Sequence, residues 1–429
     1  MMRSSRRLRA GLLLIVLAVV PVGIATMRDM GAGSGVLIIP VGASPNHVAV
    51  DARARRAFVA NYGDNSLSVI DARSGAVLRT VPVGSSPADV VVNDRTGRAF
   101  VANSQDNTVS VLDAATGFVL RTVQLVMVGA AAVDEGTGHI FVTGGCGGMP
   151  GTVAMLDARS GAVLHTLNLG SIPQQVTVDG RTRRAFVTDP VAGIVSMLDT
   201  ASGRVVRTVA MDGSPTGVAV DERTGHAFVT NSGDNTVSVL DARSGTVLRT
   251  VAVGAAPSTL AVAVHTGRVF VVNARSGTVS VLDARTGAVR RTVRVGAIRP
   301  QAVGSTNPPD LAVDERAGRV FVLNGSSSDR NGNPTNGSVS VLDAGSGRVL
   351  HRIVVRPFPL AVAVDQTTAR LFVANMQPGD QIRTTGGGLS GQTMWTWVPQ
   401  RLRRWIPLLA HPAAPTRTGS VTVIDTTRL

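Results

Sequence analysis

The sequence predicts an all-β fold, a β-propeller of eight four-stranded blades. A segment ending in Ser-Val-Leu-Asp or a close variant recurs along the chain, most often every 42 residues, as from Asp199 to Asp241. Eight Phe-Val pairs recur in step with this segment. Only three residues are Glu and none is Lys, whereas helical surfaces use both freely. A radially repeated unit of about this length is typical of a propeller blade.

The first 26 residues predict an export signal or an N-terminal membrane anchor. Four arginines between positions 3 and 9 precede an uncharged, mostly apolar stretch over 10–26. Small residues up to Ala25 favour cleavage there, and an uncleaved anchor is the alternative. We therefore expect the protein in the periplasm, at the cell surface or outside the cell.

Residues 36–429 are expected to form the propeller. The fifth repeat shows the pattern, with strand a over 217–221, strand b over 226–231, strand c over 236–241 and strand d over 246–251. Val, Phe and Thr alternate with small or polar residues, as in strands. Asp-Glu-Arg-Thr-Gly joins a to b, and Asp-Ala-Arg-Ser-Gly joins c to d. Both are hairpin turns, because Asp bonds its own backbone and Gly takes a positive φ.

The number of blades follows from the strand pattern. Strands a, b and c recur eight times, but strand d follows only the first seven sets because the chain ends at Leu429. A d-like segment over 36–41 stands alone before the first repeat. We expect it to complete the last blade, because such closure leaves no free sheet edge. Seven blades, with one unit outside the ring, is the alternative.

The repeats resemble those of the YVTN family of β-propellers, which is found in exported propellers of the YncE-like kind. The tetrapeptide that names the family appears as FVAN, FVTN, FVVN or FVLN, beginning at Phe58, Phe100, Phe228, Phe270, Phe321 and Phe372. Phe replaces the family's Tyr throughout, and the third and fourth repeats carry FVTG and FVTD instead. The resemblance implies a propeller and export, and seven blades are the commoner number in this family.

The repeats differ mainly in loop length. The b–c loop is longer in blades 3, 7 and 8 than in the other five, and the d–a loop that enters blade 7 is longer as well. Both kinds of loop emerge on the same face of a propeller. Insertions are tolerated in any surface loop, but the three longest here fall in the adjacent blades 7 and 8. We therefore expect the ligand face to be formed by the loops of these two blades.

The longest insertion, at 377–419, holds all three tryptophans and a short basic amphipathic segment. Its candidate binding residues are Trp395, Trp397, Arg401, Arg403, Arg404 and Trp405. Trp and Arg anchor many protein interfaces, and a basic amphipathic helix can also lie on a membrane. We expect contact with a protein or cell-envelope ligand. Membrane-surface contact, a lid, and a loop packed on its own ring are the alternatives.

Few residues suggest metal binding or catalysis. Among the histidines, only His47 joins the candidate binding residues, because it is placed in a d–a loop on the insertion-bearing face. Asp329, Asn331 and Asn333 match the first ligand positions of a calcium loop, but Pro334 stands where that loop needs Gly. We assign no catalytic residue and expect no cofactor, with Ca²⁺ as the alternative.

The sequence therefore predicts a non-catalytic binding scaffold. A single Cys excludes an intramolecular disulfide, a Cys-rich zinc site and covalent c-type haem. A propeller enzyme with lactonase- or lyase-like activity is one alternative, and it needs non-repeating polar residues at the channel. A nucleic-acid or other polyanion binder is the other. Of the net charge of +14, residues 1–30 and 377–419 carry +4 each, so the ring itself is only mildly basic at +6.

Overall fold

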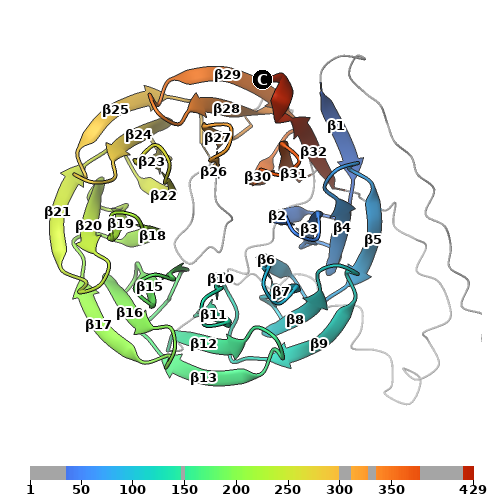
Figure 1. Cartoon of the computed structure of the whole chain (residues 1–429), viewed down its shortest axis with the longest axis horizontal. Helices are drawn as coiled ribbons and strands as arrows, with labels where there is room; N and C mark the ends of the chain where they lie inside the picture. The colour runs from blue at the N-terminus through green and yellow to red at the C-terminus, as the bar shows by residue number, and fades with distance from the viewer. Residues whose placement is uncertain (1–34, 146–149, 299–310, 327–334, 377–418) are drawn as a thin grey trace, which may run out of the picture.

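In the computed structural model the chain forms a closed ring of eight antiparallel sheets, each with four strands (Figure 1). The structure describes residues 35–145, 150–298, 311–326, 335–376 and 419–429. Strand a of each blade lies nearest the ring axis, and strand d lies on the circumference. The predicted eight-bladed propeller is confirmed, and the seven-bladed alternative is wrong.

The strands follow the repeat along the chain. Blades 1 to 4 comprise β2 (Pro45–Asp51), β3 (Arg56–Asn61), β4 (Ser66–Asp71), β5 (Val77–Pro82); β6 (Pro87–Asn93), β7 (Arg98–Asn103), β8 (Thr108–Asp113), β9 (Val119–Gln124); β10 (Ala131–Asp134), β11 (His139–Gly144), β12 (Thr152–Asp157), β13 (Val163–Asn168); β14 (Gln175–Asp179), β15 (Arg184–Asp189), β16 (Ile194–Asp199) and β17 (Val205–Ala210). Blades 5 to 8 comprise β18 (Pro215–Asp221), β19 (His226–Asn231), β20 (Thr236–Asp241), β21 (Val247–Ala252); β22 (Pro257–Ala263), β23 (Arg268–Asn273), β24 (Thr278–Asp283), β25 (Val289–Arg294); β26 (Leu311–Asp314), β27 (Arg319–Asn324), β28 (Gly337–Asp343), β29 (Val349–Val355); β30 (Pro359–Asp365), β31 (Arg370–Asn375), β32 (Ser420–Asp425) and the N-terminal β1 (Val36–Pro40). A 3-10 helix, η1 (Thr426–Arg428), follows β32.

The N-terminal strand completes the last blade, as predicted. β1 pairs antiparallel with β32 along its whole length and without a register shift. Main-chain hydrogen bonds continue beyond both ends of the strand: the Val41 N–H donates to the Gly419 carbonyl oxygen (3.0 Å), and the Asp425 N–H donates to that of Gly35 (2.9 Å). The ring is therefore closed by strand pairing rather than by a loop.

The hydrophobic core lies between blades rather than within them. Buried side chains form eight clusters, one at each interface between neighbouring blades. Every strand b contributes one Phe that is at most 1% exposed. Phe228, for example, packs with Val237 and Val239 of its own blade and with Leu260 and Val269 of the next. The Phe that begins each family tetrapeptide is therefore the largest core side chain of its interface.

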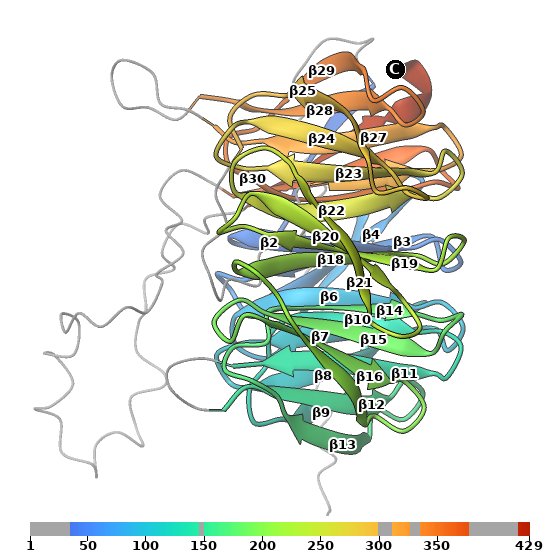
Figure 2. The ribbon, with the colours of Figure 1, turned by 90° about the vertical axis from the view of Figure 1, so that its left-hand side faces the viewer.

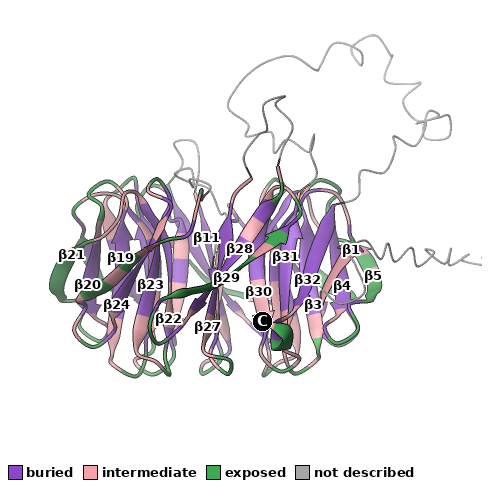
Figure 3. Ribbon diagram, turned by 90° about the horizontal axis from the view of Figure 1, so that it is seen from above, coloured by how far each residue is buried: buried purple, intermediate pink, exposed green. Residues whose placement is uncertain are grey.

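The ring has two faces, and different sets of turns and loops join the strands at each of them (Figures 2 and 3). We call the side with the a–b and c–d turns the turn face, and the side with the b–c and d–a loops the insert face. The described residues that flank the insertions are bonded to the d–a loops of the insert face. The Gly325 N–H donates to the Ala297 carbonyl oxygen (2.8 Å), and the Gly419 N–H donates to that of Gly42 (3.0 Å).

Aspartates order the turns of the turn face. Asp241 accepts hydrogen bonds from the Ser244 N–H (2.7 Å) and from the Ser244 hydroxyl (2.7 Å). These two bonds hold the pKa of the Asp241 carboxyl below its usual value. The Asp that ends strand c has a lowered pKa in every blade. The repeated Asp residues therefore serve the turns, as the sequence pattern indicated.

The three glutamates of the chain share one position at the turn face. Each directly follows strand a of an odd-numbered blade and accepts a main-chain N–H of the a–b turn of the preceding blade. The three pairs are Glu135 with the N–H of Asp94 (3.0 Å), Glu222 with that of Gly180 (2.9 Å) and Glu315 with that of His265 (3.1 Å). The rare glutamates thus connect blades 2 to 3, 4 to 5 and 6 to 7.

Asp94 is expected to make stability depend on pH. Burial, followed by repulsion from Asp51 and Glu135, raises its pKa to about 6. Because the pKa of Asp94 is higher in the folded state, its protonated form favours the fold. That contribution is fully present below the unfolded pKa of 3.8 and is lost as pH rises through about 6. Asp94→Asn should therefore raise the free energy of unfolding by about 1 kcal/mol near pH 7.5, a value reduced for solvent screening, and by little near pH 4. Urea unfolding at the two pH values tests this, and an equal change at both would contradict it.

Candidate functional site

Non-repeating polar residues gather at the insert-face ends of the innermost strands. The residue four positions before the end of strand a is of a different type in each described blade, except that two blades share Ala. From blade 1 to blade 6, and then in blade 8, it holds His47, Asp89, Ala130, Gln175, Gly217, Thr259 and Ala361. The turns of the opposite face instead repeat the same residue types from blade to blade. Departure from the repeat is therefore concentrated near the axis on the insert face.

His47 and Asp89 form a pair between the first two blades. His47 Nε2 lies 3.1 Å from Asp89 Oδ1, and the two side chains are only 12% and 10% exposed. The second Asp89 oxygen accepts the Ala131 N–H of the third blade (2.8 Å). The sequence placed His47 in a d–a loop, but it lies within β2, because that strand begins two residues earlier. Asp89 lies on β6, the innermost strand of the second blade (Figure 1).

Two buried polar atoms beside this pair lack a partner. The register of β2 on β3 shifts between Pro45 and His47, so Asn46 is the extra residue of a bulge. Asn46 Oδ1 and His47 Nδ1 are buried and accept or donate no hydrogen bond within the described part of the chain. A buried polar atom without a partner costs about 1–3 kcal/mol, which a bound water or ligand group would offset. We call Asn46, His47 and Asp89 the inner-rim site.

A buried oxygen without a hydrogen-bond partner among the described residues does not by itself indicate a binding site in this fold, because one such oxygen, an Asn Oδ1, recurs in most blades. The Asn that ends the family tetrapeptide donates from its amide to hydroxyls of strand c, as Asn61 does to Ser66 and Ser68 (both 2.9 Å). Its Oδ1 is buried without a hydrogen-bond partner among described residues at Asn61, Asn103, Asn231, Asn273, Asn324 and Asn375. Repetition in six blades indicates a structural role. The inner-rim site is distinguished because its residues occur once.

Polar groups elsewhere on the inner rim connect blades. Gln175 Oε1 accepts the Val218 N–H of the next blade (2.8 Å). The Thr216 hydroxyl donates to the Ser258 carbonyl oxygen of the blade after that (3.2 Å). These side chains are therefore engaged between strands, whereas Asn46 Oδ1 and His47 Nδ1 have no hydrogen-bond partner among the described residues.

The other predicted site residues lie outside the described residues. These are the insertion residues Trp395, Trp397, Arg401, Arg403, Arg404 and Trp405 and the calcium candidates Asp329, Asn331 and Asn333. The part of the chain that the structure describes contains no group of three or more His, Cys, Asp or Glu arranged to hold a metal ion. In that same part, no helix has the length and apolar character needed to cross a bilayer.

Two family models match the ring. Residues 219–313 match the model described as YNCE-like beta-propeller, a range that runs from strand a of blade 5 to strand a of blade 7. The resemblance to YncE-like propellers is confirmed. Residues 63–227 match a model described as outer membrane protein assembly factor BamB, so the two matches overlap in the fifth blade. No curated protein matches the chain.

Solved structures share the propeller fold of this chain. A functionally unknown protein from Desulfotomaculum acetoxidans DSM 771 is 14% identical with a TM-score of 0.56, and the match covers 71% of this chain and 99% of that one. Dihydro-heme d1 dehydrogenase NirN in complex with DHE is 13% identical with a TM-score of 0.58, covering 79% and 77% of the two chains. At such identities the likeness shows the fold alone.

Proposed function

We propose that this protein is an exported binding scaffold whose ligand face is the insert face. The observation that carries the proposal is that variation in loop length and in inner-rim residues is concentrated on one side of a regular ring. The described residues that flank the four insertions lie at the insert face, as does the non-repeating inner-rim site, whereas the turn face largely repeats. Loops on a rigid scaffold are where binding residues gather. The insertions of blades 7 and 8, with Trp395, Trp397 and Trp405, would add anchor residues to this face.

The inner-rim site would supply the polar part of recognition. Asp89 holds the His47 ring at Nε2 and is itself fixed by the third blade, so the imidazole is oriented in advance. His47 Nδ1 and Asn46 Oδ1 then remain as the atoms that a ligand can satisfy. Preorganised groups lose little conformational entropy on binding, which favours affinity.

A second candidate function is hydrolytic or eliminating enzyme activity of the lactonase or lyase type. The observation in its favour is the same His47–Asp89 pair, because a carboxylate that orients an imidazole is a common arrangement for general acid–base catalysis. Such activity would place the reacting atoms beside His47 Nδ1. Hydrolysis of simple lactones that disappears in His47→Ala would replace the scaffold proposal with this one.

Retention on envelope fractions in about 0.5 M salt, which screens charge-dependent contact with lipid, tests the scaffold proposal. One variant replaces 377–419 with the short b–c turn of the fifth blade, and a second is His47→Ala. The matched control is His265→Ala, which removes the His of a comparable pair on the turn face, where Nδ1 lies 2.9 Å from Glu315. We expect each insert-face variant to reduce retention at least about tenfold, equivalent to about 1.4 kcal/mol, and the control to leave it unchanged. Equal retention of all three variants would exclude the insert face as the ligand face.

A further inference from the structure

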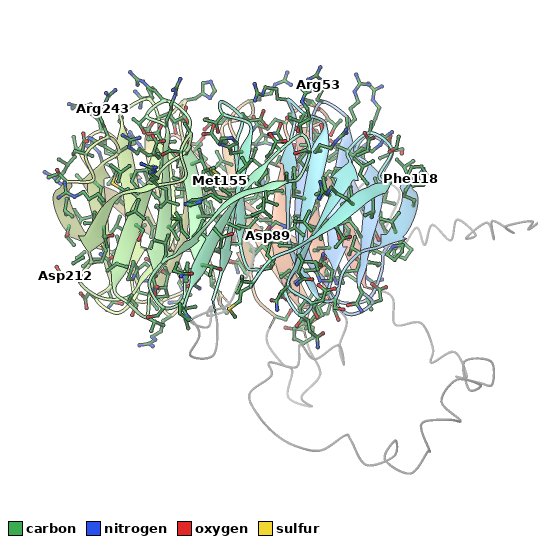
Figure 4. The ribbon with its side chains drawn as sticks, turned by 90° about the horizontal axis from the view of Figure 1, so that it is seen from below. Arg53, Asp89, Phe118, Met155, Asp212 and Arg243 are labelled. Atoms are coloured by element: carbon green, nitrogen blue, oxygen red, sulfur yellow. The ribbon has the colours of Figure 1, made fainter. Side chains whose placement is uncertain are left out.

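The turn face carries a layer of exposed arginines. Thirteen of the arginines in its turns are exposed, namely Arg53, Arg55, Arg73, Arg95, Arg159, Arg181, Arg183, Arg204, Arg223, Arg243, Arg285, Arg316 and Arg348. Arg53 and Arg243 project from this face, whereas Asp212 lies on the opposite one (Figure 4). Exposed acidic residues of the insert face include Asp64, Asp106 and Asp234. Among the described residues, exposed acids and arginines are therefore mixed at the insert face, whereas arginines prevail at the turn face.

The carboxylates of the turn face lie beneath this layer. The Asp at the end of strand a is buried wherever it occurs, as at Asp221 (0% exposed), and the Asp at the end of strand c is half-buried in every blade. Among the acidic residues of these turns, only Glu135 and Glu222 are exposed. Because the acids are held inside by N–H and hydroxyl donors, the outermost charges are guanidinium groups, although acids and bases on this face are similar in number.

Several of these guanidinium groups are available for contact. Arg73, Arg159 and Arg243 occupy the same c–d turn position in blades 1, 3 and 5, and all three are exposed. Their backbone N–H groups donate to the turn Asp. Their side chains form no hydrogen bond or ion pair with any residue that the structure describes. These three positions can therefore be changed without removing a contact of the fold.

Exposed apolar residues border the same face. The first two residues of strand d, which directly follow the c–d turn, are exposed and apolar in six blades. The second is a bulge residue that points outward, because the register on strand c skips it, as at Leu248. The pairs are Val77–Leu78, Val119–Leu120, Val163–Leu164, Val205–Val206, Val247–Leu248 and Val349–Leu350. Arginines surrounded by an apolar rim are a combination suited to a membrane interface.

We propose that the turn face docks flat on the anionic surface of a phospholipid bilayer. Guanidinium groups match the geometry of phosphate oxygens, and the turns that carry them are nearly uniform in length, so their tips lie in one layer (Figure 3). The planar layer fits a lipid surface better than a nucleic acid. Among the described aromatic residues of these turns only Phe118 is exposed, and one face of its ring is covered by the Arg79 guanidinium at 4.0 Å, so the turn face lacks the series of aromatic side chains on which successive bases stack. Docking in this way leaves the insert face free for its ligand.

Vesicle binding of the full chain tests the proposal. The turn-face variant combines Arg73→Gln, Arg159→Gln and Arg243→Gln. The control variant removes the same charge from exposed arginines of the insert face, namely Arg275→Gln, Arg294→Gln and Arg356→Gln. Both retain the N-terminal segment and every insertion, so their difference reports on the turn face alone. The probes are vesicles of phosphatidylcholine, alone or with about 30% phosphatidylglycerol.

We expect binding only to the anionic vesicles, and release as salt rises from about 0.05 M to about 0.5 M. The turn-face variant should bind about a hundredfold more weakly, because each arginine contributes about 1 kcal/mol near such a surface, and the control should change little. Equal weakening of both variants, binding that ignores lipid charge, or displacement from vesicles by low concentrations of duplex DNA would each overturn the proposal. The scaffold proposal is tested by envelope retention of the insert-face variants, and the docking proposal by vesicle binding of the turn-face variant. Either result can fail while the other holds.

Discussion

Phe228→Ala is expected to lower the free energy of unfolding by about 4 kcal/mol. Phe228 is fully buried between blades 5 and 6. Its removal deletes apolar contacts on both sides of that interface and leaves a cavity, because strands held by sheet hydrogen bonds on each side cannot collapse into the space. Because this Phe recurs in all eight blades, the same loss is expected at the equivalent positions.

Phe118→Ala is the matched control for this prediction. Phe118 is 57% exposed beside strand d, and its contact beyond the turn is with the Arg79 guanidinium. Its replacement should cost less than about 1 kcal/mol. Urea unfolding followed by circular dichroism compares the two variants. Similar midpoints for Phe228→Ala and Phe118→Ala would mean that the interface between blades is not where stability resides.

The fold was predictable because the sequence contains eight copies of one blade repeat. When the copies are compared with one another, the alternating positions, the turns and the Phe recur in all of them, whereas features that arise by chance occur in only one. The lone segment over 36–41 could be placed because seven of the eight copies have a strand d of their own. Strand pairing in the structure agrees with each of these points.

The candidate site was predictable only in part. His47 was singled out, but its partner Asp89 was not, because the pair joins strands of different blades that are 42 residues apart and depends on how the blades meet at the axis. Comparison of strand a position by position provides the missing signal: His47 and Asp89 occupy the same place in consecutive copies and neither repeats. The glutamates were also missed, because their partners are main-chain N–H groups and carry no side-chain pattern.

The 377–419 insertion could not be predicted in the same way as the blades. It has no second copy in the chain, so neither its ends nor the orientation of Trp395 or Arg401 can be inferred by internal comparison. Its assignment to a binding role depends on composition and on where its neighbours lie. Gly419, at its C-terminal end, is bonded to Gly42 on the insert face.

Ile39→Asp is expected to have the other large effect on stability, because it disrupts the closure of the ring. Ile39 is 5% exposed in β1 and packs in the cluster between blades 8 and 1. A carboxylate there is buried without a partner, which costs several kcal/mol or is avoided by release of the strand. Release leaves β32 as an open edge and uncovers the adjacent core.

The control for closure is Leu248→Asp, which introduces the same charge on a strand d that is continuous with its own blade. Leu248 is 51% exposed, so the change should stay within about 0.5 kcal/mol. We expect Ile39→Asp to reduce the free energy of unfolding by about 4 kcal/mol, to expose the region before residue 42 to protease, and to promote dimers through the open edge. Because blades bury their cores against each other, the loss should appear in the unfolding of the whole ring. Protease sensitivity at the N-terminus with an unchanged unfolding midpoint would instead show that β1 is an accessory strand and that the other blades hold the ring without it.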